Sequence, residues 1–182
     1  MSKILSNNFY NNLETVINDI VELDENKEIF KNIDWELEAS NYIESFSKFF
    51  NSVKLEILKE YDINTIGVID ICWNEYAGDI ELDFMPSNNF DDAFDEGCIM
   101  NNHAVDNDKF FKEYFNTDGE SAGSDIPEDY DAIVLSFYHL IKDIIKQVTN
   151  LDSFKKLPKK IPCHIALALS HDDERENILS FN

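Results

Sequence analysis

The sequence predicts an α+β fold in which a small, mainly antiparallel sheet of at least three strands packs against long amphipathic helices. Apolar residues recur at three- and four-residue steps in residues 6–61 and again in residues 131–150. Between these blocks, residues 65–85 change to the two-residue period of strands, and a short apolar run follows at 161–170. We expect residues 1–182 to form a single domain, because this length with 43% apolar residues is enough for one core.

Residues 1–61 predict a pair of helices. The first spans Ser6–Leu23, and the second begins after Asp34, a suitable N-cap residue, and continues to about Tyr61. Each helix carries an apolar stripe through which the two would pack together, or which would alternatively serve as a homodimer face. The predicted core positions are Phe9, Leu13, Val16, Ile17, Ile20 and Val21 in the first helix, and Trp35, Tyr42, Ile43, Phe46, Phe50, Val53, Ile57 and Leu58 in the second.

Residues 65–85 predict a β-hairpin. Thr65–Trp73 is β-branched and nearly continuously apolar, residues 74–78 form a connection that ends in Gly78, and Asp79–Phe84 alternates strictly. This alternation places Ile80, Leu82 and Phe84 on one face of the strand and Asp79, Glu81 and Asp83 on the other. We therefore expect the second strand to turn a row of carboxylates toward solvent.

Residues 86–130 predict a long acidic loop region, because Asn, Asp, Gly and Ser dominate and periodicity fades. Asp108–Phe115 is expected to form a short helix within it. Residues 131–150 predict a helix with an apolar core face, and residues 161–170 predict a buried strand. The stretch 172–179 is expected to end the chain with one or two helical turns.

The net charge of −22 is concentrated in the middle of the chain. Of 37 acidic residues, 20 lie within residues 60–131, where Lys109 and Lys112 are the only basic ones. This distribution indicates a localised negative surface and a basic protein partner. Direct binding of nucleic acid is not expected, since affinity for phosphates comes from clustered Lys and Arg.

The cysteines and the hydropathy indicate a cytoplasmic protein. Cys72, Cys98 and Cys163 are widely spaced and include no Cys-x-x-Cys pair, so free thiols in a reducing compartment are expected. The first ten residues lack a basic segment followed by an apolar run, and no stretch has the length and apolarity of a membrane span. We expect no membrane association.

The motifs that carry metal or catalytic chemistry are weak. A calcium loop centred on Gly119 would match at Asn116, Asp118 and Asp125, but its first ligand position is Tyr114, so an acidic turn is the alternative. The four histidines lack zinc spacing, and Ser170-His171-Asp172 is a run of neighbours rather than a triad. We therefore predict no catalytic, cofactor-binding or metal-binding residues and no enzyme activity. An enzyme or metal-binding domain that uses the acidic middle region remains an alternative.

The acidic region interleaves carboxylates with aromatic side chains, as in residues 88–97. Phe90 and Phe94 would either anchor a partner or pin this segment to the core while the acids face water. We predict that this region binds a basic protein. The predicted partner-binding residues are Glu75, Tyr76, Asp79, Glu81, Asp83, Phe90, Asp91, Asp92, Phe94, Asp95, Glu96, Asp118, Glu120, Asp125, Glu128 and Asp129.

The general plan of the chain resembles that of small acidic bacterial immunity-type proteins from polymorphic and contact-dependent toxin systems. The resemblance lies in the composition, the order of elements, and the ending Leu167–Asn177, which follows a long helix and a lysine-rich segment. It implies a non-catalytic inhibitory protein that occludes a basic toxin or nuclease. A DNA-mimic inhibitor of a DNA-binding enzyme is the related alternative.

Overall fold

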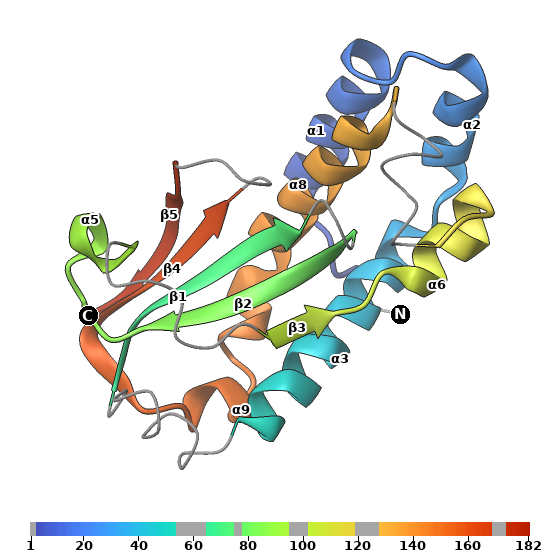
Figure 1. Ribbon diagram of the computed structural model, residues 1–182. Helices are drawn as coiled ribbons and strands as arrows, with labels where there is room; N and C mark the ends of the chain where they lie inside the picture. The colour runs from blue at the N-terminus through green and yellow to red at the C-terminus, as the bar shows by residue number, and fades with distance from the viewer. Residues whose placement is uncertain (1–2, 54–64, 75–77, 95–101, 119–127, 169–173) are drawn as a thin grey trace.

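The computed structural model describes residues 3–53, 65–74, 78–94, 102–118, 128–168 and 174–182, and it confirms the α+β fold. Five strands form one mixed sheet in the order β3-β2-β1-β4-β5, and the larger helices cover one of its faces (Figure 1). We call the face against these helices the inner face and the opposite one the outer face. The strands are β1 (Ile66–Asn74), β2 (Asp79–Met85), β3 (Asn102–Val105), β4 (Lys159–Ala168) and β5 (Glu176–Phe181).

The sheet is built around the predicted hairpin of β1 and β2. These strands pair antiparallel, with Asp70 opposite Asp83 and Trp73 opposite Ile80. Gly78 closes their connection at φ 62°, a left-handed conformation that glycine adopts without steric cost, and its N–H donates to Asn74 O at 2.8 Å. The β2–β3 and β4–β5 pairs are also antiparallel, whereas β1 and β4 run parallel.

Three helices, rather than the expected pair, form the N-terminal part: α1 (Asn7–Asp19), α2 (Asp24–Asn32) and α3 (Trp35–Ser52). Asp34 caps α3 as predicted, since its Oδ1 accepts from Leu37 N at 3.1 Å. The expectation of two helices is wrong because residues 20–23 leave the helical path and α2 begins a new one. The predicted continuation of the second helix toward Tyr61 lies outside the described residues.

The inner face of the sheet packs against α8 (Tyr130–Val148) and α3. Trp73 of β1 stacks on Phe137 of α8 with ring centroids 5.0 Å apart, and Phe49 of α3 lies 6.0 Å from Phe84 of β2. Helix α1 packs on α8, and the short α9 (Asp152–Lys155) packs on α3. Ile80, Leu82 and Phe84 are buried on this face, as the alternation predicts.

In its described residues, the middle region contains more regular structure than the loop that its composition predicts. It contains α5 (Phe90–Ala93), β3, α6 (Asp108–Phe110) and a π-helical turn, η2 (Phe111–Phe115). The last two elements are the expected short helix at 108–115. The apolar side chains Ala93, Val105, Phe110 and Phe111 are buried, and this burial offsets the entropy of ordering a polar segment.

The chain ends in a strand rather than in the expected helical turns. The backbone of β5 pairs with β4, and Ile178, Leu179 and Phe181 pack against the main core. Backbone pairing across a sheet edge is a non-local interaction that local periodicity does not report. None of the described helices has the length and apolarity needed to cross a membrane.

Candidate functional site

The predicted carboxylate row of β2 lies on the outer face of the sheet, but much of it is withdrawn from solvent. Asp83 and Glu81 are half-buried, and Glu81 Oε1 accepts from Asn74 Nδ2 at 2.7 Å. Asp79 is only 8% exposed, so its assignment to a partner-facing surface is wrong. The reason is that strand alternation distinguishes two faces but not which of them is covered.

Asp70 of β1 adds a further carboxylate to this face, opposite Asp83. It is 2% exposed, and its Oδ2 accepts from Arg175 Nε at 3.3 Å. Burial raises the pKa of Asp70, and the Arg175 guanidinium opposes that rise. Asp70 Oδ1 has no hydrogen-bond partner among the described residues. The pair is therefore an internal contact, and buried pairs of this kind contribute little net stability.

Helix α5 is fixed to the outer face by its aromatic side chains. Phe90 and Phe94 lie 5.3 Å apart and pack on a second, small cluster of Val68, Met85, Ala93 and Ala166. The Arg175 guanidinium lies 5.3 Å from the centre of the Phe94 ring. This contact pattern supports the interpretation in which the phenylalanines pin the segment to the protein. Asp91 and Asp92 are exposed to solvent.

The other predicted residues do not form one patch with α5. Asp118 and Glu128 are exposed, but Asp118 follows η2 and Glu128 precedes α8, which lie across the sheet from α5 (Figure 1). Asp129 is fully buried, so its assignment to a partner-facing surface is also wrong. The predictions for Glu75, Tyr76, Asp95, Glu96, Glu120 and Asp125 lie outside the described residues.

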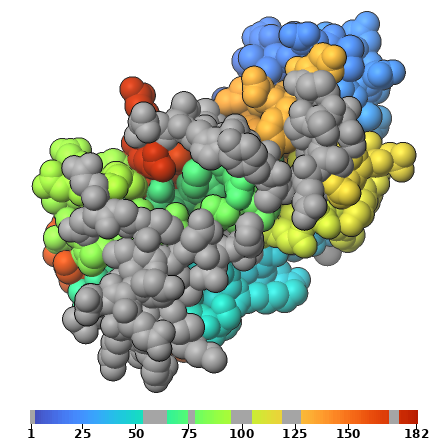
Figure 2. All heavy atoms as spheres, viewed as in Figure 1, coloured from blue at the N-terminus to red at the C-terminus, as the bar shows by residue number. Residues whose placement is uncertain are grey.

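A different surface combines exposed charge with exposed apolar area. At the connection between α1 and α2, the Ile20 and Leu23 side chains are each 38% exposed. This connection and the start of α8 project together at one end of the molecule (Figure 2). We call this surface the acidic tip. Its exposed carboxylates are those of Asp19, Glu22, Asp24, Glu25, Glu128 and Asp131.

Asp129 holds the acidic tip together from beneath. Its carboxylate accepts from Glu22 N at 2.6 Å, from Asn26 Nδ2 at 2.6 Å and from Leu23 N at 3.4 Å. These donors satisfy a buried carboxylate that belongs to the start of α8 and thereby fix the connection between α1 and α2. The arrangement gives the exposed side chains of the tip a rigid base.

Sequence reasoning did not select the acidic tip. Asp19, Glu22, Asp24 and Glu25 lie within seven residues, but the sequence predicts that the first helix continues to Leu23, so that Asp19 and Glu22 fall on it. The signal that would have found it is the combination of an acidic run with two apolar residues at a helix end. Exposed apolar side chains beside a run of charges are typical of a surface that binds another protein.

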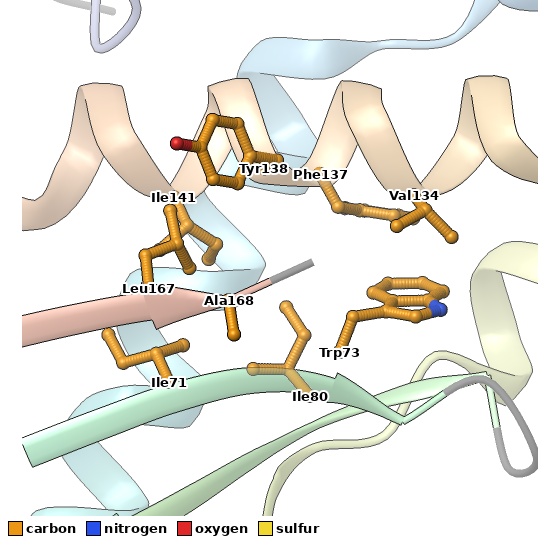
Figure 3. A pocket seen from close by; sticks show the side chains of 9 residues that line it. All are labelled: Ile71, Trp73, Ile80, Val134, Phe137, Tyr138, Ile141, Leu167 and Ala168. Atoms are coloured by element: carbon orange, nitrogen blue, oxygen red, sulfur yellow. The ribbon is translucent and has the colours of Figure 1, made fainter. Parts of the chain in front are cut away.

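The inner-face cavity shown in Figure 3 does not form a ligand site. It measures about 10 Å³ and is lined by apolar side chains of β1, β2, β4 and α8. This is at most the space of a single water molecule. The thiols of Cys72 and Cys163 are also poor nucleophiles, because burial raises the pKa of each to about 11. Within the described ranges, no group of three His, Cys, Asp or Glu side chains is arranged to hold a metal ion.

Comparisons with protein-family models, with curated proteins and with solved structures found no match to this chain. Of the surfaces described above, the acidic tip combines full solvent access with both charge and apolar area.

Proposed function

We propose that the protein is a non-catalytic inhibitory protein of the immunity type, which acts in the cytoplasm and occludes a basic toxin or nuclease through its acidic tip. One observation carries the proposal: six exposed carboxylates and the exposed apolar pair Ile20 and Leu23 belong to two chain segments that Asp129 ties together. The proposal moves the interface from the predicted middle region to the end of the molecule formed by α1, α2 and α8.

The composition of the acidic tip suits a basic protein partner. An apolar centre of Ile20 and Leu23 would be desolvated on binding, whereas the carboxylates around it would complement Lys and Arg at the rim. Lys27 offsets part of this charge, but its ammonium is 3.6 Å from Asp24, whose side chain is 99% exposed. The resulting negative potential would accelerate association and make its rate depend on salt.

Inhibition would follow from occlusion rather than from chemistry. If the partner is a nuclease, the carboxylates of the tip would occupy positions in which it otherwise holds phosphates. The buried Asp129 supports this use, because it orders the tip before the partner arrives. Less conformational entropy is then lost on binding.

The test is capture of partners by the tagged full-length protein at low and high salt, with identification by mass spectrometry. Two variants with the same change in charge make the experiment specific. The tip variant combines Glu22→Gln, Asp24→Asn and Glu25→Gln, and the control combines Asp91→Asn, Asp92→Asn and Glu174→Gln, all at exposed positions. We expect the wild type and the control to capture a basic protein at low salt. The tip variant should not capture it.

Each other outcome has a definite meaning. Equal loss in both variants would indicate a response to overall charge and would overturn the assignment to the tip. Loss in the control alone would return the interface to α5, where the sequence predicts it. If the captured partner is a DNA-binding enzyme, and if added DNA releases it from the protein, the result would favour the DNA-mimic alternative. Absence of any salt-sensitive partner would contradict the inhibitor proposal itself.

A further inference from the structure

A polar cleft of about 210 Å³ lies between α3 and the connection from β3 to α6. These elements lie side by side on one flank of the molecule (Figure 1). Its lining includes Glu38, Tyr42 and Ser45 of α3 on one side and Asp106 and Phe110 on the other. The cleft is far larger than the apolar cavity of the inner face and has space for several water molecules.

The floor of the cleft is a fixed hydrogen-bond network. Tyr42 is 2% exposed, and its hydroxyl donates to Asn107 Oδ1. Asn107, which is 3% exposed, donates from Nδ2 to Gly78 O at 2.9 Å. The amide of Asn107 therefore uses both its oxygen and its nitrogen in this network.

Glu38 is the charged side chain of this cleft that is most withdrawn from solvent. It is 6% exposed, and burial raises the pKa of its carboxyl, an effect that nearby Glu113 and Asp34 reinforce and that Asn41 and Lys109 oppose. The pKa of Tyr42 is raised first by burial and then by the carboxylates of Glu38, Asp106 and Asp79. Several carboxylates thus act on one small volume.

The cations at the rim offset this charge only in part. Lys48 is paired with Glu44 at 2.7 Å, and both side chains are largely exposed. Lys109 is exposed at the opposite rim. A positive group within the cleft would therefore relieve the repulsion among its carboxylates and replace the water that Glu38 has lost.

We propose that this cleft binds a small organic cation, with a primary ammonium paired to Glu38. The buried Glu38 carboxylate on the α3 side is the acceptor for the ammonium, and the exposed Asp106 carboxylate on the opposite side adds negative charge to the cleft. The volume suits a molecule of roughly five to eight non-hydrogen atoms. This site is separate from the acidic tip and does not depend on the function proposed for it.

The test titrates the full-length protein with butylammonium and with 1,4-diaminobutane, using butan-1-ol as the neutral control. Nuclear magnetic resonance of the ¹⁵N-labelled protein reports binding at the amides of Tyr42, Ser45 and Asn107. We expect saturable shifts with both ammonium compounds and none with the alcohol. Glu38→Gln should weaken binding about tenfold or more, since a charge-assisted hydrogen bond is lost.

Two variants separate binding from folding. Glu44→Gln removes an exposed carboxylate at the rim of the same cleft and should change affinity by less than about twofold. Ser45→Leu should block the cleft sterically while Glu38 remains, and it should abolish the shifts. The proposal is overturned if the alcohol binds as well as the ammonium compounds, if Glu38→Gln binds normally, or if no saturable shift occurs in the wild type.

Discussion

The acidic tip and the cleft each contain a carboxylate that is more than nine-tenths buried, but the two carboxylates differ in their partners. Asp129 beneath the tip accepts from two backbone N–H groups and one side-chain amide. Glu38 in the cleft is opposed by Glu113 and Asp34 and is helped by Asn41 and Lys109. A buried carboxylate that accepts hydrogen bonds from its own chain stabilises the fold. A buried carboxylate that lies among other negative charges is instead available to bind a positively charged ligand.

The largest effect expected from this contrast is on stability at Asp129. Asp129→Ala leaves the N–H groups of Glu22 and Leu23 and the amide of Asn26 without their acceptor. We expect a loss of about 3 kcal/mol or more in the free energy of unfolding, measured by urea denaturation. Glu128→Ala is the matched control, because this neighbour is exposed, and its effect should stay within about 0.5 kcal/mol. Similar losses in both variants would contradict the structural role of Asp129.

The second effect concerns the floor of the cleft. Tyr42→Phe keeps the ring but removes the hydroxyl that donates to Asn107, so a buried acceptor loses its donor. The expected loss in the free energy of unfolding is about 1–3 kcal/mol. Tyr10→Phe is the control: Tyr10 O–H donates to Glu36 at 3.0 Å in a partly exposed position, where water can replace it. A larger loss at Tyr10 than at Tyr42 would show that the cleft floor is less fixed than described.

The sequence predicts those elements whose signal is local. Asp34 marks the start of α3 because an N-cap acts within three residues, and alternation assigns Ile80, Leu82 and Phe84 to the inner face. It does not predict β5, whose formation depends on pairing with β4, or the burial of Asp129, whose donors are more than 100 residues away. Distant contacts decide these cases, and composition does not report them.

The two candidate sites also depend on contacts between distant parts of the chain, which local sequence patterns do not report. The cleft joins residues 38–48 with residues 105–110, so its volume is a property of the fold. One local sign of it exists: Glu38 interrupts the apolar spacing of Trp35, Ala39 and Tyr42 on the buried side of α3. A carboxylate at a core-facing helical position is a signal that periodicity analysis can use. The acidic tip likewise needs the start of α8 to complete it.

The third expected effect is a gain in the free energy of unfolding, and its size depends on pH. Because burial raises the pKa of Glu38 in the folded state, its protonated form is favoured there. The stability linked to that proton is fully present below the ordinary Glu pKa and is lost as pH rises through the raised folded value. We therefore expect Glu38→Gln to unfold like the wild type at low pH and to be more stable above that window. Thermal unfolding across pH measures this difference.

Glu38→Gln thus links stability to function in the cleft. A variant that gains stability while it loses binding of the ammonium probes would identify Glu38 as a residue retained despite its effect on folding. Glu44→Gln, at an exposed and lysine-paired position of the same helix, should show neither change. A pH-independent gain at Glu38 would point to better packing of the amide instead of the removal of buried charge.

The smallest effect on stability is expected at the surface of the tip. Glu22→Gln, Asp24→Asn and Glu25→Gln together remove like charges that repel one another in water, an effect that the loss of Asp24 and Glu25 from the first turn of α2 offsets in part. The free energy of unfolding should therefore rise only slightly, within about 0.5 kcal/mol per site. This gain should disappear at high salt, because exposed charges are screened. That outcome would show that folding does not require these carboxylates. If neutralising them instead destabilises the protein at all salt concentrations, the carboxylates serve the fold and the contrast between the tip and the cleft fails.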